Sequence, residues 1–277
     1  MKEGNSMDNR KNRLKDLVVA LAATVTVIVI RKILTNTLLG TVRDEVYEVF
    51  YSKLIMAGLV IIAVLILRKM RIHLFSFTLL RGGLLTGLFF VLLAIFRLLV
   101  AQNTATDTGT RMLVFILAML LVGYTEEALF RGLIQNAFHK LFGEASWQAV
   151  WGACLCTGVL FGAAHLSNIF QPDVSASAAI VQAVTNVFVG VYLCAMYYRT
   201  GKCLWYVIII HAFNDFCAFL GTGFLAGGSA GASISVMAMP LDTMVKALPI
   251  MAMLYLLPAL IVLRPNKVKP LLGKKVI

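Results

Sequence analysis

The segment YTEEALFR, residues 124–131, begins at the last residue of the uncharged run MLVFILAMLLVGY, residues 112–124. Together they predict one long apolar helix that carries Glu126, Glu127 and Arg131 at depth. An ionisable side chain in the centre of a bilayer costs roughly 3 kcal/mol or more, so such residues are rare unless they have a function. This stretch therefore predicts both a membrane helix and a functional site within it.

The composition is that of an integral membrane protein. Hydrophobic residues make up 60% of the 277 residues, only 14% are charged and the mean hydropathy is +0.87, far from the average of soluble proteins. We expect an all-α, polytopic fold that forms a single membrane domain over residues 1–277. About eight apolar stretches approach spanning length: 14–34, 46–67, 82–100, 112–138, 147–167, 174–198, 203–223 and 247–263.

The net charge of +12 is distributed as in a membrane protein rather than a nucleic-acid-binding protein. Seventeen lysines and arginines lie at the termini and in the loops predicted on the same side as them, and six lie on the other side. The positive-inside rule then places both termini in the cytoplasm, which needs an even number of spans. The sequence predicts a protein of a bacterial-type plasma membrane, with the lipid bilayer as partner and no nucleic acid.

The helical spacing of the acidic motif predicts different roles for its two carboxylates. Glu127 and Arg131 are four residues apart, so they share a helix face and can form an ion pair. Glu126 lies about 100° around the helix and is left without that partner, which suits a general base. The alternative is a buried ion pair that only locks helices together, with Glu126 as a bystander.

Two histidines lie on later apolar segments. His165 ends the fifth predicted span, and His211 lies inside the seventh, four residues before Asp215. That carboxylate can orient the imidazole, and Asn214 on a neighbouring face can donate a hydrogen bond to an oxyanion. The other two histidines, His73 and His139, are predicted to have surface roles.

Three spaced motifs occur in this order on successive predicted helices. They are Glu126-Glu127-x-x-x-Arg131, Phe161-x-x-x-His165 and His211-x-x-x-Asp215. In this they resemble the signature motifs of the CPBP family, the CAAX proteases and bacteriocin-processing enzymes also called Abi proteins. A relative of that family is the Ras-converting CAAX prenyl endopeptidase. The resemblance covers about residues 112–220, a four-helix catalytic core, whereas the first three spans and the last carry no diagnostic motif.

The resemblance implies a role for each residue of the motifs. Glu126 and His165 would activate a water for attack on a peptide carbonyl, while Glu127 and Arg131 hold the geometry. His211 and the fourth residue after it would stabilise the oxyanion; many relatives have Asn there, but this chain has Asp215. Because an ionised Asp would repel an oxyanion, Asp215 is either protonated, orients His211, helps to hold a metal, or leaves the donor role to Asn214.

The metal requirement has two readings. Members of the family are commonly described as metalloproteases, and Glu126, His165 and His211 could provide a zinc site with an open water position. However, the chain has no HExxH motif, and a glutamate–histidine mechanism needs no metal. We favour the metal-free mechanism and keep zinc as the alternative.

The function predicted from these observations is an intramembrane endopeptidase. Its substrates would be membrane-associated peptides or proteins, such as lipidated CAAX-type proteins or bacteriocin and pheromone precursors, or it would act in self-immunity. Two alternatives come from other classes: an ion-coupled transporter, since buried Glu, His and Arg also form proton relays, and a catalytically silent membrane scaffold or immunity protein. The absence of an inverted repeat disfavours the transporter.

Overall fold

The computed structural model describes residues 2–67, 83–100, 109–171, 174–226 and 240–272. The described residues are 89% helical and include no strand, which confirms the predicted all-α class. The elements are α1 (Lys2–Leu38), α2 (Glu45–Ile66), η2 (Leu84–Gly87), α4 (Leu88–Val100), α5 (Thr110–Glu127), η3 (Ala128–Gln135), α6 (Asn136–Phe142), α7 (Trp147–His165), η4 (Leu166–Phe170), α8 (Ala176–Arg199), α9 (Leu204–Gly221), η5 (Phe224–Ala226), α11 (Leu241–Val262), α12 (Pro265–Val268) and η6 (Lys269–Leu271).

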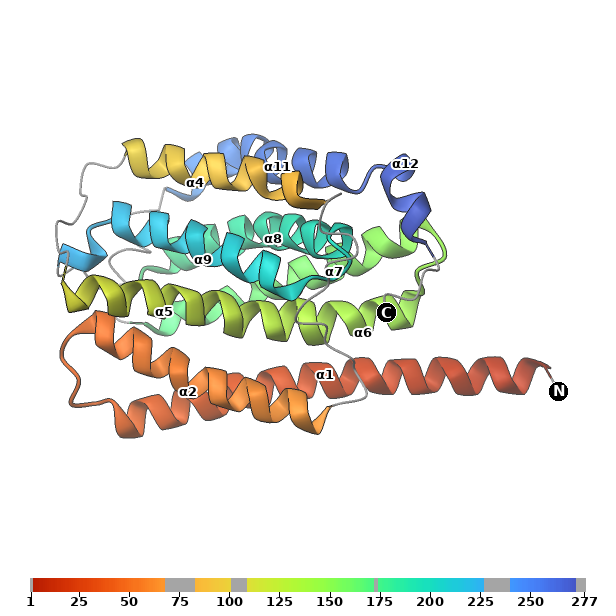
Figure 1. Cartoon of the computed structure of the whole chain (residues 1–277), viewed down its shortest axis with the longest axis horizontal. Helices are drawn as coiled ribbons and strands as arrows, with labels where there is room; N and C mark the ends of the chain where they lie inside the picture. Colours follow the sequence, from red (N-terminus) through yellow and green to blue (C-terminus); the bar gives the residue numbers. More distant parts are fainter. Residues whose placement is uncertain (1, 68–82, 101–108, 172–173, 227–239, 273–277) are drawn as a thin grey trace.

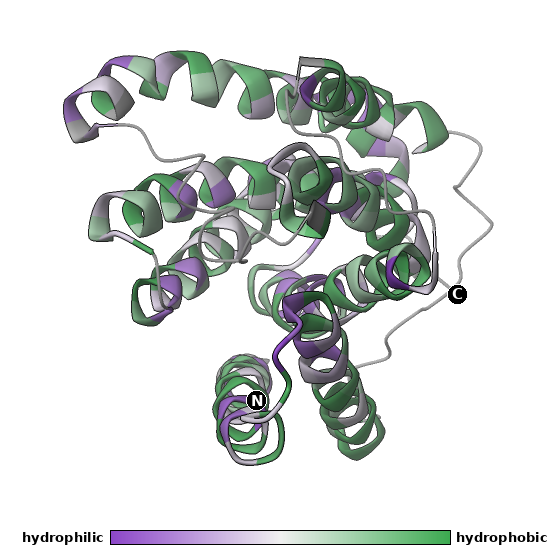
Figure 2. Cartoon of the chain, turned by 90° about the vertical axis from the view of Figure 1, so that its left-hand side faces the viewer, coloured by the Kyte–Doolittle hydropathy of each residue, from purple (hydrophilic) through white to green (hydrophobic). Residues whose placement is uncertain are grey.

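Seven helices in the described part of the chain are long and apolar enough to cross a membrane. The remaining predicted span, 82–100, the third along the chain, corresponds to a shorter apolar helix, Leu84–Leu99. At 1.5 Å per residue this helix is about 24 Å long, slightly less than the hydrocarbon thickness of a bilayer. Figure 2 shows hydrophobic residues along most of the ribbon, as expected for helices that face lipid.

The helices form three groups that lie side by side (Figure 1). Helices α5, α7, α8 and α9 are central; α1 and α2 pack together, with α2 against α5, and α4 and α11 pack on α9 and α8 respectively. The N-terminal end of α1, the α6–α7 connection and α12 lie at the same end of the bundle (Figure 1). This arrangement agrees with an even number of passes, and the cytoplasmic location of the termini stays a prediction.

The helix predicted over 112–138 has an irregular centre. Ala128–Gln135 forms a π-helix between α5 and α6, directly after Glu127. Such wide turns are rare and are found mostly at functional sites. All eight residues of this segment are buried, so the acidic motif runs into the interior of the bundle.

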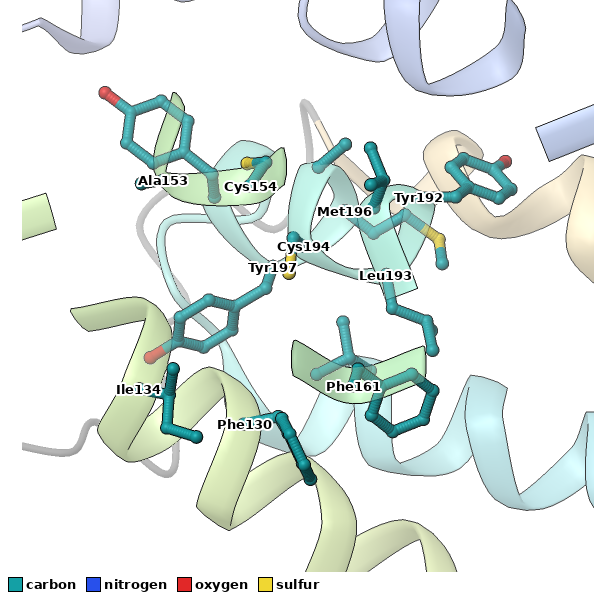
Figure 3. Packing of buried hydrophobic residues seen from close by; sticks show 14 of the residues in the cluster. Phe130, Ile134, Ala153, Cys154, Phe161, Tyr192, Leu193, Cys194, Met196 and Tyr197 are labelled. Atoms are coloured by element: carbon teal, nitrogen blue, oxygen red, sulfur yellow. The ribbon is translucent and has the colours of Figure 1, made fainter. Parts of the chain in front are cut away.

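Glycines allow the central helices to approach closely. A Cβ atom on Gly162 of α7 would lie 2.5 Å from the carbonyl oxygen of Ala183 in α8, and one on Gly123 of α5 would lie 2.7 Å from that of Ile208 in α9. Figure 3 shows the side chains that close the core beside α7 and α8, among them Phe130, Phe161 and Tyr197. The short helix separations bring the polar residues of α5, α7 and α9 within reach of one another.

The start of α2 is attached to the start of α5. Asp44 caps α2 by accepting a hydrogen bond from the Val46 amide at 2.9 Å, and it pairs with Arg111 of α5, also at 2.9 Å. Burial raises the pKa of Asp44, but the hydrogen bonds from Arg111 and Val46 outweigh it and hold the pKa below its ordinary value. This attachment sets the register in which α2 runs along α5.

Candidate active site

The Glu127–Arg131 pair predicted from the helical spacing is present and fully buried. Arg131 Nη1 lies 2.9 Å from Glu127 Oε1, and both side chains have 0% exposure. Arg131 also donates from Nη2 to the Gly190 carbonyl of α8 at 3.2 Å, and its guanidinium lies 4.4 Å from the centre of the Phe161 ring of α7. The pair therefore connects the π-helix to two neighbouring helices.

Glu126 faces both predicted histidines. Its Oε2 atom lies 4.0 Å from His165 Nε2 and 3.9 Å from His211 Nε2. His165 Nδ1 lies 2.8 Å from the Phe161 carbonyl oxygen. Because a carbonyl can only accept, Nδ1 carries the hydrogen, and Nε2 of the neutral ring presents its lone pair towards Glu126. The structure thus brings together three groups that the sequence places on separate helices.

Glu126 has a cationic partner that the sequence analysis missed. Lys53 Nζ of α2 lies 2.9 Å from Glu126 Oε1, and the two side chains are 17% and 16% exposed. The sequence analysis left Glu126 without an ion-pair partner because it considered only residues of the same helix, whereas Lys53 lies in α2, within the predicted span 46–67. A lysine inside an apolar helix was the signal that could have identified it.

His211 is held between two carboxylates. Its Nδ1 lies 2.7 Å from Glu127 Oε1 and its Nε2 lies 3.4 Å from Asp215 Oδ2. The ring is 4% exposed and packs edge-on against Phe161. Each carboxylate can accept a hydrogen bond from a doubly protonated ring, so Asp215 lies where it orients His211.

Asn214 points into a second set of polar contacts. Its Oδ1 accepts a hydrogen bond from Arg97 Nη1 of α4 at 3.2 Å, and its Nδ2 donates to Asp215 Oδ1 at 3.2 Å. Arg97 also donates to the Tyr255 hydroxyl of α11. Sequence analysis missed both Arg97 and Tyr255, although an arginine within the apolar stretch 82–100 is a recognisable signal.

One further histidine is placed differently from its prediction. His139 is only 2% exposed and packs against the Tyr198 ring. Its Nε2 atom lies 3.2 Å from Gln135 Nε2. The predicted surface role is wrong for this residue, because α6 runs inside the bundle. His73 lies outside the described residues.

The described side chains do not fit a metal site. No three His, Cys, Asp or Glu side chains in that part of the chain are grouped as metal ligands. Ligands of a tetrahedral zinc ion lie roughly 3.3 Å apart, less than the 3.9 and 4.0 Å between Glu126 Oε2 and the two histidines. Lys53 also brings a positive charge to Glu126, which opposes cation binding.

Comparison with known families identifies the central part of the chain. The model of the family described as type II CAAX prenyl endopeptidase Rce1-like matches residues 108–217. The resemblance to this family is confirmed. No curated protein and no solved structure matches the chain.

This Rce1-like segment includes every site residue predicted from the sequence, from Glu126 to Asp215. Lys53, Arg97 and Tyr255 lie outside it. The family is one of endopeptidases, so the match supports a hydrolase in general, acting from within a helical membrane protein. The helices around the Rce1-like segment therefore add side chains to the site that lie outside the matched residues.

Proposed function

We propose that the chain is an intramembrane endopeptidase that hydrolyses peptide bonds of membrane-associated peptides or proteins, including lipidated CAAX-type substrates. The observation that carries this proposal is the geometry of Glu126, whose Oε2 faces His165 Nε2 and His211 Nε2 at 4.0 and 3.9 Å. It occurs inside a segment matched to an endopeptidase family. The transporter and scaffold alternatives have no comparable observation in their favour.

The proposed reaction uses Glu126 and His165 to activate water without a metal. A gap of 4.0 Å between Oε2 and Nε2 is short enough for one water to hydrogen-bond to both atoms. Glu126 takes a proton as the water oxygen attacks the carbonyl carbon and forms a tetrahedral intermediate. The same carboxyl then gives that proton to the amide nitrogen, and the C–N bond breaks to release an amine and a carboxylic acid.

His211 is the proposed donor to the oxyanion of that intermediate. Its Nε2 lies 3.9 Å from Glu126 Oε2, close enough to reach the oxygen of a carbonyl held beside the attacking water. Nε2 carries a single hydrogen, so in this proposal the oxyanion takes the hydrogen bond that Asp215 Oδ2, 3.4 Å away, accepts in the free site, and Asp215 does not itself touch the oxyanion. Asn214 is engaged with Arg97 and Asp215, so it acts as a positioning residue.

Glu127 and Arg131 also serve as positioning residues. Glu127 Oε1 contacts both Arg131 Nη1 and His211 Nδ1, at 2.9 and 2.7 Å. It therefore fixes the imidazole relative to the π-helix. Electrostatic preorganisation of this kind is effective only when the donor cannot rotate away.

The test is a comparison of membrane and secreted peptides from cells that carry either the wild type or Glu126→Gln. Mass spectrometry should find peptide products that depend on the wild-type chain, with the uncleaved precursors accumulating in the variant. Identical peptide profiles with equal amounts of folded protein would overturn the proposed function.

A further inference from the structure

Helices α1 and α2 bring two cations to the site from outside the Rce1-like segment. Lys53 of α2 pairs with Glu126 Oε1 at 2.9 Å. Arg31 of α1 donates from Nη1 to the Ser52 hydroxyl, the neighbour of Lys53, at 3.0 Å. No carboxylate in the described residues is ion-paired with that guanidinium.

The charges around the site do not balance. Apart from the histidines, the described residues there include three carboxylates and four cations, and protonation of a histidine would increase the surplus of positive charge. The carboxylates are Glu126, Glu127 and Asp215, and the cations are Arg31, Lys53, Arg97 and Arg131. A cation without a counter-ion at this depth is costly, so the site favours an incoming anion.

Lys53 contacts the proposed general base and Arg31 bonds to the residue next to Lys53, and both cations have hydrogen-bond donors left for a ligand. An ammonium has three donors and a guanidinium has five, whereas one donor of each is engaged with Glu126 and Ser52. A carboxylate is the anion that a peptide provides, and arginine binds it in a planar, two-point geometry. Arg131, by contrast, is fully buried with Glu127 and Gly190.

We propose that Arg31 and Lys53 form an anion subsite that binds a carboxylate of the substrate next to the scissile bond. The inference rests on the endopeptidase function proposed above and adds a preference for substrates with a carboxylate near the cleaved bond. Because an extended chain covers about 3.3–3.6 Å per residue, the carboxylate belongs within about three residues of the cleaved bond. The chain terminus and an acidic side chain are the two sources of that group. Binding there also draws Lys53 away from Glu126 Oε1 and frees the base.

Three quenched-fluorescent reporter peptides test the subsite, each with a prenylated cysteine followed by three residues. The first ends in a free carboxylate, the second in a carboxamide, and the third in a carboxamide with glutamate as its last residue. With the purified full chain in liposomes, we expect kcat/KM for the first to exceed that for the second by about tenfold or more. Faster cleavage of the third peptide than of the second would show that an acidic side chain can supply the bound carboxylate.

Substitutions test whether Arg31 and Lys53 cause the preference for a substrate carboxylate. Arg31→Gln and Lys53→Met should reduce the carboxylate preference to within about twofold, with Arg31→Gln acting mainly on KM because it does not touch Glu126. Lys32→Gln is the matched control, since Lys32 is exposed and lies over the Phe170 ring at 5.2 Å, and it should keep the preference. Size-exclusion chromatography checks that each variant is folded.

The outcomes separate this inference from the function on which it rests. Equal cleavage of all three peptides by the wild type, or a preference that survives both substitutions, would overturn the subsite and leave the endopeptidase intact. Absence of cleavage of every peptide, with the wild type and the variants folded, would overturn the proposed CAAX-type activity and the subsite together.

Discussion

Arg131 and Arg97 both lie inside the bundle, but their partners differ in kind. Arg131, in the Rce1-like segment, is 0% exposed and paired with a carboxylate that is itself 0% exposed. Arg97, in the surrounding helix α4, is half-buried and bonded to the neutral groups of Asn214 and Tyr255.

This difference extends to the two regions as a whole. In the Rce1-like segment, Glu127 and Arg131 form a fully buried pair that fixes geometry. Of the cations in the surrounding helices, Arg31 and Arg97 bond to neutral groups, and Lys53 is partly exposed. A buried pair with no exposed atom loses most when one partner is removed. We therefore expect the Rce1-like segment to set the reaction and stability, and the surrounding helices to set substrate choice.

The largest effect should come from Glu126→Gln. Removing the general base should lower turnover by about 10²–10⁴-fold in the liposome assay. The folded yield should change little, because the neutral isostere leaves Lys53 with access to solvent, at 17% exposure. Glu48→Gln, on α2 and outside the site, is the matched control and should keep activity. Full activity in Glu126→Gln would remove Glu126 from the mechanism.

Glu127→Gln should affect stability as well as activity. It leaves Arg131 without a charged partner in the interior, at a cost of about 3–5 kcal/mol in the free energy of unfolding. Folded yield and thermal denaturation should both fall, and the double variant Glu127→Gln/Arg131→Gln should recover part of the loss. Equal yields and equal activities for Glu126→Gln and Glu127→Gln would contradict the division of labour between the two carboxylates.

Gly162→Ala tests the close approach of α7 and α8. The added methyl group would lie 2.5 Å from a backbone oxygen, so the helices must separate, at a cost of about 1–3 kcal/mol. Activity should fall more than folded yield, since His165 is three residues further along α7. Gly58→Ala provides the control: a Cβ there meets nothing within 4 Å, and stability should stay level or rise by about 0.5–1 kcal/mol.

Arg97→Gln compares the surrounding helices with the Rce1-like segment directly. Its partners are neutral, so the folded yield should be kept, while kcat should fall by about tenfold as Asn214 and Asp215 lose their support. Arg131→Gln, the matched change inside the Rce1-like segment, should instead lose most folded protein. The comparison fails if the two arginine variants show the same yield.

Chelation should have the smallest effect. For a metal-free mechanism, activity after dialysis against a strong chelator should stay within about twofold of the untreated sample. Elemental analysis should then find well under one zinc per chain. Stoichiometric zinc, with activity lost on chelation and restored by the metal, would make Glu126, His165 and His211 its ligands and replace the proposed mechanism.

The sequence by itself determined the membrane class and the contacts made within one helix. Long apolar runs can satisfy their backbone only as helices in a bilayer, and a spacing of four residues places Glu127 beside Arg131, and His211 beside Asp215, in any helix. These predictions depend on composition and helical geometry alone. The same geometry does not foresee the π-helix over Ala128–Gln135, because tertiary packing decides where a helix widens.

Contacts between helices were decided by the tertiary structure. Counting 1.5 Å per residue puts Glu126 about 21 Å into its span and leaves His165 several ångströms off that level, yet the two side chains approach to 4.0 Å. Tilt, rotation and the glycine contacts of α7 determine that distance, and a linear sequence does not contain them. Lys53 and Arg97 illustrate the same limit: each was visible as a charge near or within an apolar stretch, but its partner came from a helix 73 or 117 residues away.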